Sequence, residues 1–337
     1  MSFIAKHITN LKKLALLLIV FLSLSSTIEA QKNMDWNGYT QLRASSNFDD
    51  NSTVMLRRLK FWVKSTPDFS EHWSYKVQVL FNSWMQEKFF LQDAKINYKT
   101  GLFSFDVGQF VPKFSLQWTQ PDYNISSIER AIVVNALHPN GSIGVRDLGV
   151  QANFHSKNNF IQSYIGVFNG YGIFEYRFQN KGYLISHKTS FNIPIRENKL
   201  QIGYSLMYRD AHDLKIKHVL PDTLAYTGSD IRYNVFAMFR SKVLELQAEY
   251  LNANFEGKIA DGFYVLAAID IKKSQIVASV EDYNNTYQTS ASPHYRLGYN
   301  YLIKNNQIKL FLDNYFQVIN GGIKNYYASI QLQMFFK

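Results

Sequence analysis

The sequence contains no cysteine among its 337 residues. Disulfide bonds and thiolate metal sites are therefore excluded in any redox compartment. Long apolar runs are missing after residue 30, so no stretch there could cross a bilayer as a helix, which needs about 20 apolar residues. Runs of five or six like charges are also absent, and although the formal net charge is +10, no polybasic arm for nucleic acid is predicted.

The first thirty residues have the organisation of a secretory signal peptide. Three lysines precede an apolar run at residues 14–24, and the stretch ends in the small residue Ala30. A run this short cannot span a bilayer, and a small residue is suited to cleavage. We predict a cleavable signal peptide at residues 1–30 and a mature domain at residues 31–337. Removing three Lys and one Glu lowers the formal charge from +10 to +8.

From residue 34 onward, apolar side chains recur at every second position. In the segment 72–81, Trp73 and Val77 lie on one face, while Lys76 and Gln78 lie on the other. This pattern and the 16% aromatic content are typical of barrel strands that turn one face to lipid. The segments with this pattern are 36–44, 54–65, 72–81, 89–99, 102–109, 147–155, 160–168, 182–192, 199–209, 231–241, 243–253, 262–272, 275–283, 294–303, 307–318 and 325–337.

Short and long connections alternate between these sixteen segments. The predicted long connections are 45–53, 110–146, 169–181, 210–230, 254–261 and 284–293. This sorting is typical of outer-membrane barrels, whose short turns are periplasmic and whose long loops are extracellular. Because an open sheet edge is not tolerated in lipid, the last strand must close on the first. We predict an all-β fold, a 16-stranded antiparallel transmembrane β-barrel in the outer membrane of a Gram-negative bacterium, with lipid but not nucleic acid as a partner.

The longest connection, about 109–146, is too rich in apolar residues to be a disordered linker. Phe114, Trp118 and Ile128 could pack against a wall. We interpret it as a long third extracellular loop folded into the barrel mouth. Its basic residues Lys113, Arg130 and Arg146 are balanced by Asp122, Glu129 and Asp147, which favours a transverse field. We expect the constriction to be set by Lys113, Glu129, Arg130 and Arg146.

Two interpretations of the loop arginines stay open. A guanidinium of Arg130 or Arg146 could bind phosphate oxygens in a bidentate manner. Alternatively, each could pair with Glu129, Asp147 or a wall carboxylate and fix the loop.

Successive side chains of a barrel strand alternate between lipid and lumen. The charged ones are assigned to the lumen, because a charge facing lipid costs roughly 2–4 kcal/mol at the midplane. The basic residues expected to line the lumen are Arg58, Lys60, Lys64, Lys76, Lys95, Arg232 and Arg296, with Arg43, Arg209, Arg240 and Lys309 also facing inward. The inward acids are Asp93, Asp106, Glu245, Glu249, Glu281 and Asp313. Basic rings attract anions. Polar walls are, however, needed in any water-filled lumen, so the preference for anions stays open.

Catalytic signatures are missing from the sequence. There is no GxSxG elbow, P-loop or HExxH motif, and none of the eight histidines has the spacing of a triad or a metal site. We therefore predict no enzyme activity, no cofactor and no metal. An outer-membrane hydrolase and an adhesive or structural barrel without a channel are the alternatives.

Several motifs around the long loop resemble one family. They are Gly108-Gln109-Phe110 with Pro112-Lys113-Phe114-Ser115, Ile128-Glu129-Arg130, Arg146-Asp147-Leu148-Gly149, and Leu56-Arg57-Arg58-Leu59 in the second segment. Together they resemble the phosphate-selective porin O and P family. The resemblance implies a sixteen-stranded porin, usually a homotrimer, with its third loop folded inward. It implies passive diffusion of small anionic or polar solutes, and leaves open whether phosphate is favoured.

Overall fold

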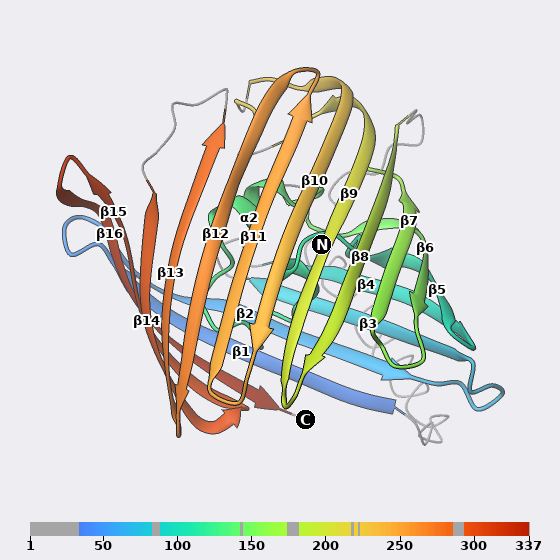
Figure 1. Cartoon of the computed structure of the whole chain (residues 1–337), viewed down its shortest axis with the longest axis horizontal. Helices are drawn as coiled ribbons and strands as arrows, with labels where there is room; N and C mark the ends of the chain where they lie inside the picture. Colours follow the sequence, from blue (N-terminus) through green and yellow to red (C-terminus); the bar gives the residue numbers. More distant parts are fainter. Residues whose placement is uncertain are drawn as a thin grey trace, which may run out of the picture.

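The computed structural model describes residues 34–82, 88–141, 144–173, 182–216, 219–221, 223–285 and 293–336. The predicted signal peptide at residues 1–30 lies outside the described residues. The described residues form sixteen strands that close into one antiparallel barrel (Figure 1). The predicted sixteen-stranded, all-β fold is therefore confirmed.

The strands follow one another around the barrel in chain order. They are β1 (Met34–Ser46), β2 (Ser52–Ser65), β3 (Trp73–Asn82), β4 (Lys88–Thr100), β5 (Phe103–Phe110), β6 (Asp147–His155), β7 (Ile161–Phe168), β8 (Tyr183–Ile195), β9 (Asn198–Leu214), β10 (Tyr226–Arg240), β11 (Leu244–Phe255), β12 (Lys258–Ile271), β13 (Ser274–Asn285), β14 (His294–Asn306), β15 (Ile308–Ile319) and β16 (Gly322–Phe336). Between β5 and β6 lie the 3-10 turn η1 (Gln117–Thr119) and the helix α2 (Ile132–Leu137).

The barrel closes where the last strand pairs with the first. Gly38 of β1 lies opposite Phe336 of β16, and Ala44 lies opposite Ile330. This antiparallel ladder leaves no free edge, as the lipid environment requires. No helix within the described residues is both long and apolar enough to cross a membrane.

The alternation of side chains separates an apolar outer face from a polar inner face. In β2, Phe61 is 38% exposed, whereas Lys60 beside it is 6% exposed. In β12, Val265 is 46% exposed, but its neighbours Tyr264 and Leu266 are buried. The exposed apolar residues cover the face that contacts lipid, and the charged residues turn inward.

A β-bulge in β2 interrupts this alternation between the inner and the outer face. Gln41 pairs with Arg58, and the next pair along the ladder joins Leu42 to Leu56, so Arg57 is the extra residue. Because a bulge sets two residues opposite one, consecutive side chains can point to the same side. The Arg57 and Arg58 side chains both reach the barrel interior.

The prediction of a long loop at 254–261 is wrong. β11 continues to Phe255 and β12 begins at Lys258, so only Glu256 and Gly257 form the turn. Their φ angles of 52° and 91° are of the kind that a tight two-residue hairpin needs.

The connection predicted at 210–230 is also shorter than expected. β9 runs to Leu214 and β10 begins at Tyr226, with Asp210 opposite Ser229 in the ladder. Polar side chains at these strand ends remove the apolar alternation, although the backbone pairing continues. The strands therefore extend beyond the part that the sequence pattern marks.

The buried apolar core lies inside the barrel. Phe114, Val133 and Leu137, which lie between β5 and β6, form one buried cluster with wall residues such as Leu184 and Leu251. α2 lies against β11, β12 and β13 (Figure 1). This core lies mainly against β8–β13 and reaches Phe110 of β5 and Phe168 of β7, while most charged groups lie on the β1–β6 side.

Candidate functional site

The described residues between β5 and β6, 111–141 and 144–146, are here called the inner segment and cross the interior of the barrel. The carbonyl of Ser115 accepts a hydrogen bond from Lys188 Nζ of β8 at 2.7 Å. Ser126 Oγ donates to Glu245 Oε1 of β11 at 2.9 Å. Further contacts, described below, reach β1, β2, β4, β9 and β10, so the inner segment meets walls on opposite sides of the barrel.

An anchor cluster of Arg209, Asp230 and Arg232 holds one end of the inner segment. Arg232 Nη1 donates to the carbonyls of Leu137 at 3.0 Å and His138 at 3.1 Å. Asp230 bridges the two arginines, with Oδ1 at 2.8 Å from Arg232 Nε and Oδ2 at 3.0 Å from Arg209 Nη2. All three residues are at most 1% exposed. The anchor cluster thus fixes the stretch after α2 to β9 and β10.

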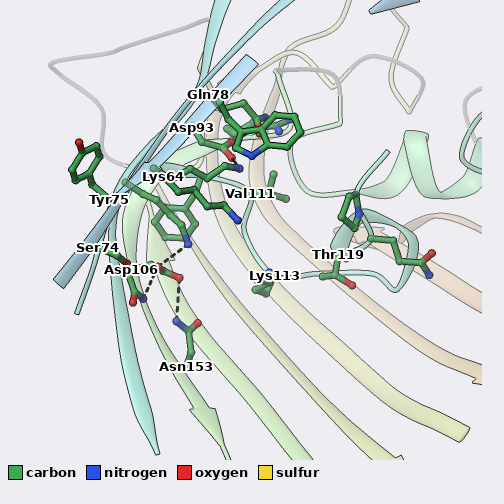
Figure 2. Close-up of a pocket in the computed structure, with 18 of the residues that line it drawn as sticks. Lys64, Ser74, Tyr75, Gln78, Asp93, Asp106, Val111, Lys113, Thr119 and Asn153 are labelled. Atoms are coloured by element: carbon green, nitrogen blue, oxygen red, sulfur yellow. Dashed lines mark hydrogen bonds and ion pairs between the residues drawn. The ribbon is translucent and has the colours of Figure 1, made fainter. Parts of the chain in front are cut away.

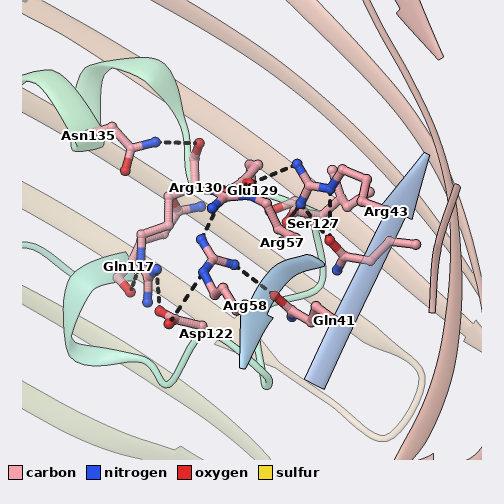
Figure 3. Close-up of polar contacts among 12 residues, drawn as sticks. Gln41, Arg43, Arg57, Arg58, Gln117, Asp122, Ser127, Glu129, Arg130 and Asn135 are labelled. Atoms are coloured by element: carbon pink, nitrogen blue, oxygen red, sulfur yellow. Dashed lines mark hydrogen bonds and ion pairs between the residues drawn. The ribbon is translucent and has the colours of Figure 1, made fainter. Parts of the chain in front are cut away.

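On the opposite side, a latch cluster joins Glu129 of the inner segment to Arg43 of β1 and to Arg57 and Arg58 of β2 (Figure 3). Glu129 Oε1 lies 2.8 Å from Arg43 Nη1 and 2.6 Å from Arg57 Nη2. Glu129 Oε2 lies 3.2 Å from Arg58 Nη2. The bulge in β2 makes this possible, because it turns two consecutive arginines toward one carboxylate.

A second carboxylate, Asp122, lies beside the latch cluster. Its Oδ2 is 2.6 Å from Lys60 Nζ, and its Oδ1 is 2.5 Å from Arg130 Nη1. Arg130 also stacks over the Trp118 ring at 4.1 Å and donates to the Gln120 carbonyl at 2.7 Å. Arg130 is therefore held within the inner segment, and Asp122 links it to β2.

Both carboxylates are stabilised as anions. Burial raises the pKa of Glu129, but the three guanidiniums of the latch cluster outweigh burial and hold that pKa well below its usual range. The pKa of Asp122 is likewise raised by burial, and is held well below its usual range by Lys60 and Arg130. Neutral and mildly acidic solutions therefore leave both groups charged.

A cavity of about 800 Å³ lies between the inner segment and the β1–β7 wall (Figure 2). Its basic lining residues are Lys60, Lys64, Lys76, Lys95, Lys113, Arg130 and Arg146. Its acidic lining residues are Asp35, Asp93, Asp106 and Asp122. The Lys95 ammonium pairs with Asp106 at 2.8 Å, and Arg146 pairs with Asp93 at 3.0 Å. Basic groups outnumber acidic ones, so the cavity carries a positive excess.

The structure places most of the predicted site residues at this cavity or at the latch cluster. All seven basic lining residues were predicted to face the lumen or the constriction. Arg58 and Glu129 lie in the latch cluster. The expectation that Arg232 and Arg296 line an open lumen is corrected, because the inner segment covers Arg232 and Arg296 is buried against Asp313 at 2.6 Å.

The two loop arginines are paired, but not with the carboxylates next to them in the sequence. Arg130 pairs with Asp122 and not with Glu129, and Arg146 pairs with the wall residue Asp93. Both side chains are buried yet reach the cavity surface. The geometry thus supports a loop-fixing role and is compatible with contact to a solute.

Sequence reasoning missed Arg57 as an interior residue and did not predict the anchor cluster. The signal for Arg57 was the Arg57-Arg58 pair itself, because two adjacent charges in a barrel strand cannot both face inward without a bulge. Among the described residues, no group of three or more His, Asp or Glu side chains is arranged to hold a metal ion.

The comparisons with known proteins agree with this geometry. The family model of phosphate-selective porin O and P matches residues 28–170, which confirms the predicted resemblance over that part of the chain. No curated protein matches the chain in sequence.

Solved structures with the same fold are outer-membrane proteins of low sequence identity. Salmonella typhi OmpF, in a complex with daunomycin, has a TM-score of 0.66 and 11% identity over 92% of this chain and 99% of that one. Pseudomonas putida OprB has a TM-score of 0.63 and 12% identity over 90% and 94% of the two chains. Vibrio cholerae OmpT, in a trimer form, has a TM-score of 0.62 and 12% identity over 90% and 99%. Residues 28–170 thus match the sequence model of the phosphate-selective porin O and P family, and the described residues form a sixteen-stranded barrel with the fold of proteins from the Gram-negative outer membrane.

Proposed function

We propose that this porin lets small hydrophilic solutes diffuse passively across the outer membrane and that it favours anions, with phosphate among them. The porin family match and the shared barrel fold support a channel without a chemical step. A signal peptide at residues 1–30, an extracellular position of the inner segment and a homotrimeric assembly belong to the same proposal. The trimer rests on the family resemblance and on the trimer form of the similar Vibrio cholerae protein.

The charge of the cavity is the observation that carries the anion preference. Seven basic side chains and four acidic ones line it. In a narrow aqueous space with low-dielectric walls, such an excess raises the local concentration of anions and lowers their barrier to passage. Arg130 and Arg146 offer the forked geometry that suits phosphate oxygens. Lys113 and Glu129 complete the proposed constriction.

Lys113 is the best residue at which to test this preference. It belongs to the inner segment, lines the cavity and lies over the Tyr164 ring at 5.5 Å. Burial, followed by the nearby charge of Lys95, lowers the pKa of Lys113 to about 8, so the amine is mainly protonated at neutral pH. Replacing Lys113 with Gln removes one positive charge from the cavity while keeping a polar side chain.

The experiment measures reversal potentials of the refolded chain in planar bilayers under a KCl gradient, followed by titration of phosphate. We expect stepwise conductance, a reversal potential directed toward anions, and a shift toward cations in Lys113→Gln. Lys157→Gln, in the exposed turn after β6, removes the same charge away from the cavity and is the matched control.

Two results would contradict parts of the proposal. Equal reversal potentials for wild type and Lys113→Gln would exclude the cavity charge as the cause of selectivity. If the chain folds into a heat-modifiable barrel but forms no channels, the porin function is refuted, and a hydrolase or an adhesion protein becomes the favoured hypothesis.

A further inference from the structure

The inner segment is held by different chemistry on its two sides. On the β8–β13 side it shares the buried apolar cluster, and the anchor cluster donates hydrogen bonds to its backbone carbonyls. An anion in solution cannot replace a carbonyl in such a contact without also disrupting the apolar core. On the β1–β2 side, Glu129 and Asp122 join carboxylates to cations, so other anions can compete for the same donors. Tyr123 also stacks on the Trp62 ring of β2 there, which an anion does not displace.

The latch cluster has the composition of an anion-binding site. Three guanidiniums converge on the single carboxylate of Glu129, at distances of 2.6–3.2 Å. The adjoining pair of Lys60 and Arg130 shares Asp122, so five cationic side chains face two carboxylates in this region. A guanidinium presents several N–H donors in a planar fork that matches the oxygens of carboxylates and phosphates. The positive excess leaves the site attractive to a further anion.

The latch cluster is also open to exchange. The Glu129 side chain is 22% exposed, and the side chains of its three arginines are 10–14% exposed. Water therefore reaches the ion pairs. The short distances also mean that no solute can pass between Glu129 and the β1–β2 wall while the pairs are formed.

We propose that Arg43, Arg57 and Arg58 form an oxyanion-binding site that Glu129 occupies as an internal ligand, and that a solute bearing a carboxylate or phosphate group opens this side of the channel by replacing Glu129. The stretch around Glu129 then separates from these three arginines, while the Tyr123 contact with Trp62 and the anchor cluster keep the rest of the inner segment in place. This inference rests on the proposed channel function. It adds to that function a dependence of opening on the solute itself.

The tether between Glu129 and its site determines the concentration at which a free anion can replace Glu129. Glu129 is tethered to the site by the chain, and a short tether gives an effective concentration of the order of millimolar. A free oxyanion should therefore compete at about millimolar concentration and not at trace levels. Chloride offers a single spherical charge without paired oxygens, so it should be a weak competitor at the same ionic strength.

A thiol reporter tests release of the latch without relying on conductance. The chain has no cysteine, so Ser127→Cys introduces a single reactive site. Ser127 is 4% exposed and its hydroxyl donates to the Glu129 carbonyl at 2.5 Å, so its accessibility follows the position of Glu129. The rate of labelling by a charged thiol reagent is measured on the refolded full chain in phosphate, succinate or chloride at equal ionic strength. Single-channel open fraction is recorded in parallel.

We expect phosphate or succinate to raise the labelling rate of Ser127→Cys by about tenfold, the change that follows from shifting a latch equilibrium by one charge-assisted contact. Adding Glu129→Gln should give fast labelling in every salt, and adding Glu129→Asp should restore slow labelling and its response to oxyanions. A response to phosphate alone identifies a phosphate-bearing solute, and a response to succinate alone identifies a carboxylate. Asp106→Asn changes the lumen charge by the same amount as Glu129→Gln but alters only wall contacts, with Lys95, Asn97 and Asn153, so it should leave the labelling rate unchanged.

Several outcomes overturn the proposal. Equal labelling in chloride, phosphate and succinate, or equal acceleration by all three, would show that no oxyanion replaces Glu129. Fast labelling in Asp106→Asn would attribute the effect to lumen charge alone. If Glu129→Gln does not fold, the labelling rates of Ser127→Cys and of its Glu129→Asp variant in phosphate, succinate and chloride still show whether an oxyanion replaces Glu129. Absence of channels in every variant refutes the porin function instead, while labelling still reports on the latch.

Discussion

Replacing Asp230 with Asn removes the only carboxylate that joins the two arginines of the anchor cluster among the described ion pairs. Arg209 and Arg232 then stay buried, at most 1% exposed, and their remaining hydrogen-bond partners among the described residues are neutral groups such as the Leu137 carbonyl. Removing one partner of a buried charge network costs about 3–5 kcal/mol, because the remaining charges are left uncompensated. The substituted amide keeps one acceptor, so we expect the lower end, about 3 kcal/mol.

The assay is reversible denaturant unfolding of the refolded barrel in detergent, followed by tryptophan fluorescence. Asp261→Asn is the control, because Asp261 accepts one hydrogen bond from the Tyr250 hydroxyl at 2.8 Å and forms no ion pair with another described residue. Its loss should cost no more than about 1 kcal/mol. If Asp230→Asn costs as little as Asp261→Asn, the anchor cluster does not depend on charge compensation, and its role in holding the inner segment is refuted.

Two further predictions concern acid and the outer face. Because the pKa of Glu129 in the folded chain is held well below its ordinary value of 4.5, the latch is stable above that value and is lost only as pH falls through the lower folded pKa. The open fraction in chloride should therefore stay constant from pH 7 to about pH 4.5, and a rise centred near the ordinary pKa would contradict this. Val265→Arg places a charge on the outer face in the middle of β12, so unfolding measured in lipid vesicles should show a loss of about 2–4 kcal/mol. Val243→Arg, exposed at the turn before β11, should cost at most about 1 kcal/mol, and equal costs would place β12 outside the lipid.

The barrel could be predicted from the sequence because its dominant signal is local. Apolar side chains recur at every second position of each strand. This alternation indicates that Lys60 faces inward and Phe61 outward, without knowledge of the strand pairing. The closure of β16 on β1 followed from the physics of lipid, which tolerates no free edge. Errors arose where the local signal fades, as at 254–261, where turn-forming and charged residues mix with the apolar ones although the strands stay paired to Phe255 and Lys258.

The candidate site was less predictable because its contacts are distant in sequence. Glu129, Asp147 and the wall carboxylates were the partners considered for Arg130, but its partner is Asp122, and Glu129 instead meets Arg43 and Arg57. No period or motif encodes which wall residue a long segment will meet. The bulge that turns Arg57 inward is likewise a property of the paired ladder and not of β2 alone.

The two sides of the inner segment should also respond differently to ionic strength. The apolar cluster around α2 is held by burial, which salt does not screen, and the anchor cluster is almost completely removed from water. The latch cluster is partly exposed, and at 0.15 M ionic strength the screening length is about 8 Å, so its ion pairs weaken as salt rises. Any motion of the inner segment that salt or solute promotes therefore begins at β1 and β2, with the anchor cluster as the fixed end. In the proposed release of Glu129, the channel would therefore widen from the wall that carries Arg43, Arg57 and Arg58, where the positive excess would hold an anion as it passes.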